Sequence, residues 1–396
     1  MKSVYLISNV QKGGKTYLEY LLPALNALRN EYNCIVLQTS ITGLSQSEAE
    51  QVLNYPVEEV EFDFIANLNS QTIISNDAAV GRLLDESNFA IFIAHGNVGM
   101  PLKDEYYCSE WTAYWDAIIS SSRSLFDLMK MGLQRYRHDR NSLRLVCDTQ
   151  SQRSDLRKTS AISTLPVKIS QAFSSPPESV RTSDEYVVGL LPTQMGLCPE
   201  GASLFENMEV VVNAVKSQIP QAQIIFRPYM TDFKSAFVKE MCEQLSRYSW
   251  ISIDTTKGSS KDFYNQCDTI ITDASSGGVS FMLNTCRLPI YYVPATSENH
   301  PVVNAWLAQM GNVLPIAKSG EELKELLLGF GLLTPEQSYS IYKNFFDSEY
   351  GDLHHPDEVF LDLVQKEHDS RFCYFAMNAA GDVSQRTIND SASVLQ

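Results

Sequence analysis

Residues 267–283 combine groups that could hold a phosphate. The segment runs Cys-Asp-Thr-Ile-Ile-Thr-Asp-Ala-Ser-Ser-Gly-Gly-Val-Ser-Phe-Met-Leu. An apolar run, a polar cluster and an apolar helical pattern predict a buried strand, a tight turn and a helix start. Such a turn offers hydroxyls, backbone N–H groups and the positive end of a helix dipole, which favour an anion. We predict a phosphate site at Ser275, Ser276, Gly277 and Gly278. The alternative is an ordinary strand–helix loop capped by Ser and Asp.

A histidine follows the apolar run 89–94 directly, at position 95. Open α/β sheets place their chemistry at the carboxyl ends of strands. His95 is a candidate base there, because the unperturbed pKa of histidine is about 6.5. The loop behind it is shaped by glycine and proline, and its candidate ligand-binding residues are Gly96, Asn97 and Lys103. The alternative is a hydrogen-bonded structural histidine.

An arginine follows the apolar run 223–226 in the same way, and Pro228 prevents a helix from starting there. Arg227 therefore either faces an anionic ligand or pairs with a carboxylate as part of the structure. Its type and position alone leave these two hypotheses equal.

The first glycine-rich turn, Gln-Lys-Gly-Gly-Lys-Thr at 11–16, invites comparison with a phosphate-binding P-loop. That motif needs a glycine five residues before its second glycine, and the position is occupied by Asn9. We therefore favour a turn in which Gly13 and Gly14 let a substrate approach the sheet, and we set a nucleoside triphosphatase aside.

These residues need strands and helices to position them, and the chain offers two series of such elements. Strand-like runs of the first series cover 4–8, 34–39, 89–94 and 116–120, and those of the second cover 186–193, 223–229, 250–254 and 288–293. A Ser-, Pro-, Arg- and Thr-rich stretch, 148–185, predicts the connection between them. Helical patterns close the chain at 320–328, 335–346 and 356–367. The sequence thus predicts an α/β protein with two Rossmann-like domains.

Composition limits the class of protein. The 396 residues are 44% hydrophobic and 20% charged, as in a soluble globular protein of two domains. No apolar run approaches the roughly 20 residues that cross a bilayer, and the start of the chain is not typical of a signal peptide. Eight scattered cysteines without metal-ligand spacing predict reduced thiols and no structural metal. We expect a cytoplasmic protein without an obligatory cofactor or cation.

Charge is distributed unevenly. The net charge of −16 argues against a nucleic-acid partner. The stretch 123–168 nevertheless holds ten basic and four acidic residues, a net charge of +6. It is either a solvated helical face or a surface for an anionic polymer or the anionic inner face of the plasma membrane.

Three segments together resemble the CDP-glycerol glycerophosphotransferase family, the teichoic-acid and capsule polymerases. That family carries H-G-T-P-[LM]-K, R-P-H-P and S-D-x-x-I-T-D-Y-S-S, each after or within a strand. The matching segments here are His-Gly-Asn at 95–97 with Pro-Leu-Lys at 101–103, Arg-Pro-Tyr-Met at 227–230, and Cys-Asp-Thr-Ile-Ile-Thr-Asp-Ala-Ser-Ser at 267–276. The Leu-Leu-Pro-Thr that ends at Thr193 is similar to the family's A-P-T element. Order and spacing hold over about half of the chain.

The resemblance implies a GT-B fold with two facing Rossmann-like domains and closing helices. We expect an acceptor domain at 1–175, a nucleotide-donor domain at 183–335 and C-terminal helices with a polar tail at 336–396. The implied activity is transfer of glycerol or ribitol phosphate from a CDP-linked donor to a hydroxyl of an anionic glycan or lipid-linked acceptor.

The resemblance also implies roles for residues. His95 would be the base and Arg227 the clamp on the departing nucleotide phosphate. Further donor-site candidates are Asp273, Thr193 and Tyr229. Tyr229 replaces the family's second histidine, and Gly277–Ser280 replaces the acidic residue usual after the Ser-Ser pair. Two alternatives therefore stay open, a glycosyltransferase with a nucleotide-sugar donor and a non-catalytic scaffold subunit.

Overall fold

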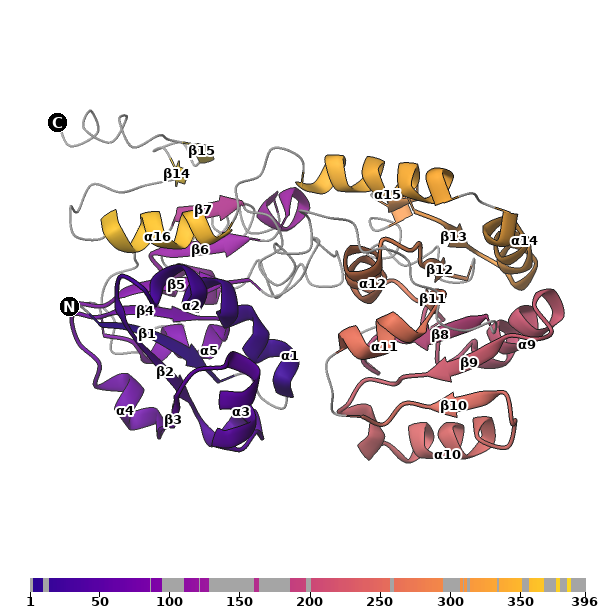
Figure 1. Ribbon diagram of the computed structural model, residues 1–396, viewed down its shortest axis with the longest axis horizontal. Coiled ribbons are helices and arrows are strands. Elements are labelled where there is room, and N and C mark those ends of the chain that lie inside the picture. Colours follow the sequence, from indigo (N-terminus) through magenta and orange to yellow (C-terminus); the bar gives the residue numbers. More distant parts are fainter. Residues whose placement is uncertain are drawn as a thin grey trace. The chain divides into compact units, whose positions relative to one another are not determined.

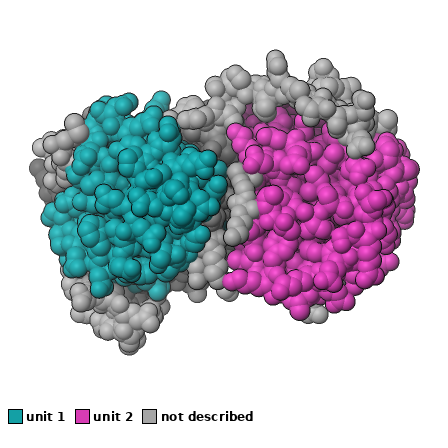
Figure 2. Space-filling model, turned by 60° about the horizontal axis from the view of Figure 1, so that its bottom comes forward, with its two compact units in different colours: residues 1–99, 103–170, 352–396 teal, residues 100–102, 171–351 magenta. Residues whose placement is uncertain are grey.

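The structure of the protein is a computed structural model. The described residues are 3–9, 14–85, 87–94, 110–120, 122–127, 160–163, 186–196, 201–256, 260–294, 307–308, 310–311, 314–332, 335–350, 356–366, 375–377 and 383–385. The chain divides into two compact units, residues 1–99, 103–170 and 352–396, and residues 100–102 and 171–351 (Figure 2). Each unit is built around one large parallel sheet.

The first unit contains a seven-stranded sheet in the order β3-β2-β1-β4-β5-β6-β7. All of its strand pairs are parallel. The strands are β1 (Ser3–Ser8), β2 (Asn33–Gln38), β3 (Val57–Glu59), β4 (Thr72–Ser75), β5 (Phe89–Ile93), β6 (Ala117–Ser120) and β7 (Ser160–Ser163). Strand order reverses between β1 and β4, which is the topological switch point where open α/β sheets bind ligands.

The helices of the first unit include one from the far end of the chain. They are α1 (Gly14–Leu18), η1 (Glu19–Leu21), α2 (Leu22–Leu28), η2 (Ser40–Thr42), α3 (Gln46–Leu53), α4 (Phe62–Ala66), α5 (Ala78–Leu83), η4 (Glu110–Tyr114) and α16 (Pro356–Lys366). Helix α16 packs on α2 (Figure 1). Its Phe360 and Leu363 are fully buried in the same core as Leu25 and Leu28. Helix α16 is thus part of the first unit's core, although it follows the second unit in the sequence.

Local sequence signals start two of these helices, α3 and α5. Ser45 and Glu48 form a reciprocal capping box at α3, in which the Glu48 N–H donates to Ser45 Oγ at 3.4 Å and the Ser45 N–H donates to Glu48 Oε2 at 2.9 Å. Asp77 caps α5 by accepting the Ala79 N–H at 2.9 Å. Such caps satisfy backbone donors that a helix start leaves without partners.

The second unit contains a six-stranded parallel sheet in the order β10-β9-β8-β11-β12-β13. Its strands are β8 (Val187–Leu191), β9 (Gln223–Phe226), β10 (Ile251–Ile253), β11 (Thr269–Thr272), β12 (Ile290–Tyr292) and β13 (Ile316–Ala317). Its helices are α9 (Met208–Gln218), η6 (Asp232–Lys234), α10 (Ala236–Leu245), α11 (Ser260–Gln266), α12 (Gly277–Thr285), α14 (Gly320–Leu332) and α15 (Pro335–Tyr350). The switch point here lies between β8 and β11.

Alternation along β8 assigns the two faces of the second sheet. Val188 and Leu190 belong to the core that also holds α9 and α14 residues. Val187 and Leu191 pack instead against the cluster of α11 and α12 residues. Gly189 lies on this second face, where a Cβ would be 2.7 Å from both Cys267 Sγ and Phe263 Cζ. The glycine therefore lets α11 pack closely on the sheet.

The predicted α/β class with two Rossmann-like halves is confirmed, and most predicted strands agree with the structure to within one to three residues. The stretch 148–185, predicted as the connection between the domains, includes the division between the two units at residues 170 and 171. This polar stretch contains β7, which pairs with β6 at the edge of the first sheet. Its sequence, Ser-Ala-Ile-Ser, is too short to give a recognisable strand pattern, and its pairing with β6, about 40 residues earlier in the sequence, stabilises it. A small antiparallel pair, β14 (Phe375–Met377) and β15 (Val383–Gln385), was not predicted either.

Candidate functional site

The candidate site of the second unit is the carboxyl edge of its sheet. Strands β8, β9, β10 and β11 end there, and each is followed by at least one polar residue that the structure describes. Since parallel strands end at the same edge, residues distant in sequence come together beside the switch point.

The turn between β11 and α12 is held by hydroxyl groups. Thr272 Oγ1 donates to the Leu191 carbonyl at 2.6 Å and lies 2.9 Å from Ser275 Oγ. Ser275 Oγ in turn accepts the Gly277 N–H at 3.1 Å, at the first residue of α12. Ser275, Ser276 and Gly277 are each half-buried. The predicted strand, turn and helix start are present, and the two serines reach the surface at the positive end of α12.

The two glycines of this turn have a packing role that the sequence did not reveal. A Cβ at position 278 would lie 2.5 Å from Tyr291 Cζ on β12, and a Cβ at position 277 would lie 2.8 Å from Leu191 Cδ2. The contact at position 278 is with a fully buried ring, so α12 can approach β12 this closely only with glycine there. The contact at position 277 is with the end of the half-buried Leu191 side chain, which can shift, so packing alone requires Gly278 but not Gly277.

Asp273 and Thr193, predicted as donor-site candidates, contact each other across the switch point. Thr193 donates to Asp273 Oδ1 through its hydroxyl at 2.5 Å and through its backbone N–H at 3.0 Å. The Leu204 N–H donates to Asp273 Oδ2 at 3.0 Å. Burial raises the pKa of the fully buried Asp273, although the hydrogen bonds from Thr193 and Leu204 oppose this shift. Asp273 therefore fastens the loop after β8 and the segment before α9 to the end of β11.

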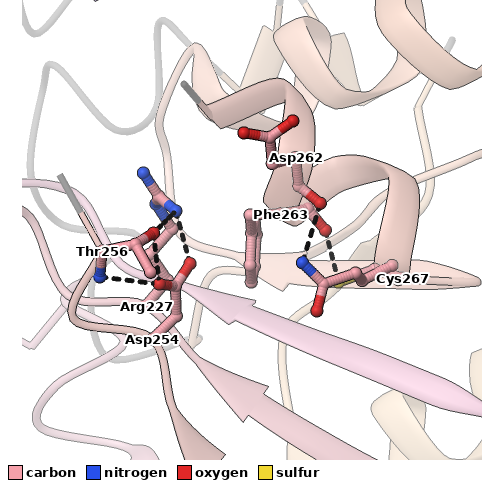
Figure 3. A network of polar contacts seen from close by, with 7 residues as sticks. Arg227, Asp254, Thr256, Asp262, Phe263 and Cys267 are labelled. Carbon is pink, nitrogen blue, oxygen red and sulfur yellow. Dashed lines mark hydrogen bonds and ion pairs between the residues drawn. The ribbon is translucent and has the colours of Figure 1, made fainter. Parts of the chain in front are cut away.

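Arg227 follows β9 on the sheet face that carries α11. The preceding Phe226 packs on the α9 face, with its ring 6.1 Å from that of Phe205, and alternation turns Arg227 to the opposite face. There its guanidinium forms an ion pair with Asp254, and Cζ lies 5.5 Å from the Phe263 ring centroid (Figure 3). The sequence left open whether Arg227 faces an anionic ligand or pairs with a carboxylate. In this structure it pairs with the Asp254 carboxylate.

The Asp254 carboxylate, which the sequence interpretation overlooked, is held on both oxygens. Oδ1 accepts the Thr256 N–H at 2.9 Å and the Thr256 hydroxyl at 2.7 Å, while Oδ2 accepts from Arg227. Burial alone would raise the pKa of Asp254, but the Thr256 hydrogen bonds and the Arg227 charge outweigh it and lower this pKa. The sequence did hold a signal for Asp254 as a site residue: it follows an apolar strand directly, just as Arg227 follows the neighbouring β9.

Asp232 is a second overlooked carboxylate at this edge. It is buried, and its Oδ2 accepts the Met195 N–H at 2.8 Å. Its own N–H donates to the Tyr229 carbonyl at 2.8 Å, so it links the loops after β8 and β9. Burial raises the pKa of Asp232, and the hydrogen bond from Met195 opposes that shift. Tyr229, a predicted donor-site residue, is 38% exposed in the same loop.

The carboxyl edge of the first unit also carries a polar cluster at its switch point. Asn9, after β1, donates through Nδ2 to Asp77 Oδ2 at 2.6 Å, and Thr39, after β2, donates to Asn9 Oδ1. Asn76, after β4, donates to the Tyr17 carbonyl at 2.7 Å. Among the described residues, the buried Asn76 Oδ1 has no hydrogen-bond partner. The sequence interpretation named none of these as binding residues.

Most residues predicted for the acceptor side lie outside the described residues. They are His95, Gly13, Gly96, Asn97 and Lys103. Gly14 is the first residue of α1. Of the charged residues of the basic stretch 123–168, the described part of the chain includes Arg123, which is exposed, and Asp127.

Three further features of the described parts of the two units concern metal ions, membrane spans and cysteines. Within them, no group of three or more His, Cys, Asp or Glu is arranged to hold a metal ion. No helix there is long and apolar enough to cross a membrane. The described cysteines Cys34, Cys242, Cys267 and Cys286 are free thiols.

Two doubly wound parallel α/β units in one chain, with a last helix that returns to the first unit, define the GT-B fold. The predicted fold class is thereby confirmed. No protein-family model matches the chain, and no curated protein matches it in sequence.

Three solved structures illustrate the likeness. The wall teichoic acid polymerase TagF has a TM-score of 0.56 at 13% identity, over 93% of this chain and 90% of its own. A putative UDP-N-acetylglucosamine 2-epimerase from Listeria monocytogenes has a TM-score of 0.58 at 11% identity, over 94% and 97%. The S. aureus MnaA–UDP co-structure has a TM-score of 0.56 at 11% identity, over 93% and 97%. At these identities the likeness concerns the fold.

Proposed function

We propose that this chain is a transferase that uses a nucleotide-diphosphate donor in the synthesis of a cell-surface polymer. The observation that carries the proposal is the turn at Ser275–Gly277, which presents two half-buried serines at the start of α12. This turn lies beside the switch point of a doubly wound sheet, where such folds bind ligands.

The donor phosphates would accept hydrogen bonds from the Ser275 and Ser276 hydroxyls and from backbone N–H groups at the start of α12. Arg227 follows β9, two strands away in the sheet, and would place a permanent positive charge beside the departing nucleotide phosphate. Fixed donors stabilise the charge that builds on a leaving group without having to reorganise. Asp273 and Thr193 would act on the donor by holding the loop after β8 in place.

The finer proposal is transfer of glycerol or ribitol phosphate from a CDP-linked donor. It rests on the three ordered segments that resemble the glycerophosphotransferase family. His95 would take the proton from the acceptor hydroxyl as that oxygen attacks phosphorus, and such a base contributes about 10²–10⁴-fold in rate. Gly13, Gly14, Gly96, Asn97 and Lys103 would contact the acceptor. The basic stretch 123–168 would bind an anionic acceptor or the inner face of the plasma membrane.

The structural neighbours are consistent with the coarser proposal. One is a teichoic acid polymerase by its name, and another was determined with UDP. If this chain shares their ligand chemistry as well as their fold, its donor is a nucleotide diphosphate.

A second candidate is a glycosyltransferase with a nucleotide-sugar donor. The observation that favours it is Tyr229, which carries an exposed phenol where the resembled family has an imidazole. Transfer of a sugar does not need that second histidine, and the same serine turn would hold a sugar-linked diphosphate.

Calorimetric titration with CDP-glycerol, CDP-ribitol, CMP, UDP and UDP-sugars tests the proposal, with Arg227→Ala as the comparison. Selective binding of a cytidine nucleotide that is lost in the variant supports a CDP-linked donor, and phosphorus-31 NMR should then detect a new phosphodiester in the product. Preference for uridine and a new glycosidic bond would support the second candidate. Absence of all nucleotide binding would refute both and favour a scaffold role.

A further inference from the structure

The positive charge of Arg227 is balanced by the carboxylate of Asp254. Its ion pair with Asp254 involves Nη1, which also lies 3.5 Å from Thr256 Oγ1. The Arg227 and Asp254 side chains are 9% and 12% exposed. Figure 3 shows the Phe263 ring beside the pair and another Arg227 nitrogen pointing away from the carboxylate. An incoming anion therefore meets a guanidinium whose charge is balanced by a neighbouring carboxylate.

Asp254 is fixed in this position. Its Oδ1 is held by both the backbone N–H and the hydroxyl of Thr256, so the carboxylate cannot turn away without losing two hydrogen bonds. Its backbone N–H donates to the Phe226 carbonyl at 2.9 Å and so continues the pairing of β10 with β9. The negative charge is thus a permanent part of the Arg227 environment.

We infer that Asp254 determines which anions Arg227 can bind: it excludes lone inorganic anions and admits ligands that are anchored elsewhere as well. This inference rests on the proposed donor site. A lone phosphate would gain one contact with Arg227 and would be repelled by Asp254, so its net attraction is small. A nucleoside diphosphate would also bind at the Ser275–Gly277 turn. Strands β9 and β11 flank β8, so their ends lie two strand spacings apart, about 10 Å.

This arrangement is a form of selection against the wrong ligand. Specificity is a difference between two affinities, and a repulsive group can supply it as effectively as an attractive one. In a cell rich in inorganic phosphate, an uncompensated arginine at the sheet edge would be occupied by that ion. Asp254 would keep Arg227 available for the donor.

The test is calorimetric titration of inorganic phosphate and of UDP and CDP into wild type, Asp254→Asn and Asp262→Asn. Asp254→Asn removes the charge but keeps an oxygen that can accept from Arg227. Asp262→Asn is the matched control, because Asp262 is an exposed residue on α11 that is not part of the Arg227–Asp254 ion pair (Figure 3). We expect Asp254→Asn to bind inorganic phosphate at least about tenfold more tightly than wild type. Asp262→Asn should match wild type, and Arg227→Ala in the Asp254→Asn background should abolish the gain.

Unchanged or weaker phosphate binding by a folded Asp254→Asn protein would overturn the inference, as would an equal gain in Asp262→Asn. Asp254→Ser supplies a second uncharged variant in case the asparagine disturbs folding. If neither variant folds, Asp254 is required for the structure and the selectivity role is refuted.

The outcomes separate this inference from the proposed function. Nucleotide binding by wild type tests the donor site. The gain in phosphate affinity in Asp254→Asn tests the control of Arg227 by Asp254. A gain without nucleotide binding would refute the donor proposal while retaining the role of Asp254 as a barrier to lone anions.

Discussion

Replacing Gly278 with alanine should destabilise the protein, because α12 would then be too close to β12. The nearest atom to the new Cβ would be the Tyr291 hydroxyl oxygen, followed by Tyr291 Cζ at 2.5 Å and Thr272 Cγ2 at 3.1 Å. An ordinary contact needs at least 3.4 Å, so the ring or the helix must move by about 0.9 Å. Tyr291 is fully buried on β12, so its ring is enclosed by other atoms of the protein.

The expected magnitude is the difference between two effects. Overpacking of a dense core costs about 1–3 kcal/mol. Alanine gains up to about 1 kcal/mol over glycine in a helix. Because the contact is with a fully buried ring, we expect an overpacking cost in the upper part of this range, about 2–3 kcal/mol. After an alanine gain of about 1 kcal/mol the net loss is about 1–2 kcal/mol, which corresponds to a decrease in Tm of about 2–8 °C for a unit of this size.

Gly329→Ala in α14 is the matched control, because a Cβ there would meet nothing within 4 Å. It should be neutral or stabilising by up to about 1 kcal/mol. Thermal unfolding followed by circular dichroism measures both variants. Adding Tyr291→Phe to Gly278→Ala removes the hydroxyl oxygen and should recover part of the loss. Equal stability of Gly278→Ala and wild type, or an equal loss in both glycine variants, would refute the packing argument.

Two further predictions concern the same edge of the sheet. First, the carboxylates of Asp273 and Asp254 should give opposite pH dependences in urea unfolding. Because the pKa of Asp273 is raised from 3.8 in the folded state, wild type should gain stability relative to Asp273→Asn as pH falls through that raised pKa, with the full gain present below 3.8. Because the pKa of Asp254 is lowered from 3.8, wild type should lose stability relative to Asp254→Asn as pH falls below 3.8, and equal pH profiles would contradict both assignments. Second, Ser275→Ala should cost about 1 kcal/mol, since Ser275 Oγ accepts the Gly277 N–H, whereas Ser276→Ala should stay within about 0.5 kcal/mol because its side chain makes no cap hydrogen bond. Both serine variants should weaken nucleotide binding, and a loss of stability in Ser276→Ala equal to that in Ser275→Ala would show that the turn is held differently.

Much of the fold could be predicted from the sequence. The strand that ends at Thr272, the turn at Ser275–Gly277 and the helix after it are coded by short-range signals, namely an apolar run, helix-start residues and a helical period. The same holds for β9 and the arginine after it. These features depend on neighbours in the chain and are therefore visible without a structure.

Partners across the sheet could not be predicted in the same way. Arg227 and Asp254 are 27 residues apart, and Thr193 and Asp273 are 80 residues apart. They meet because β9 pairs with β10 and β8 pairs with β11. The sequence predicted Arg227, Thr193 and Asp273 as site residues but not these contacts, and it overlooked Asp254 and Asp232.

The sequence by itself therefore determined most strands and helices of the two large sheets and the polar residues that follow β8, β9 and β11. The tertiary structure decided what those residues do. It made Gly278 a packing requirement of α12 against Tyr291, Asp273 a buried anchor for Thr193, and Arg227 the partner of a carboxylate. The physical reason is that periodicity and capping act over a few residues, whereas burial, close packing and charge pairing depend on which strands lie side by side.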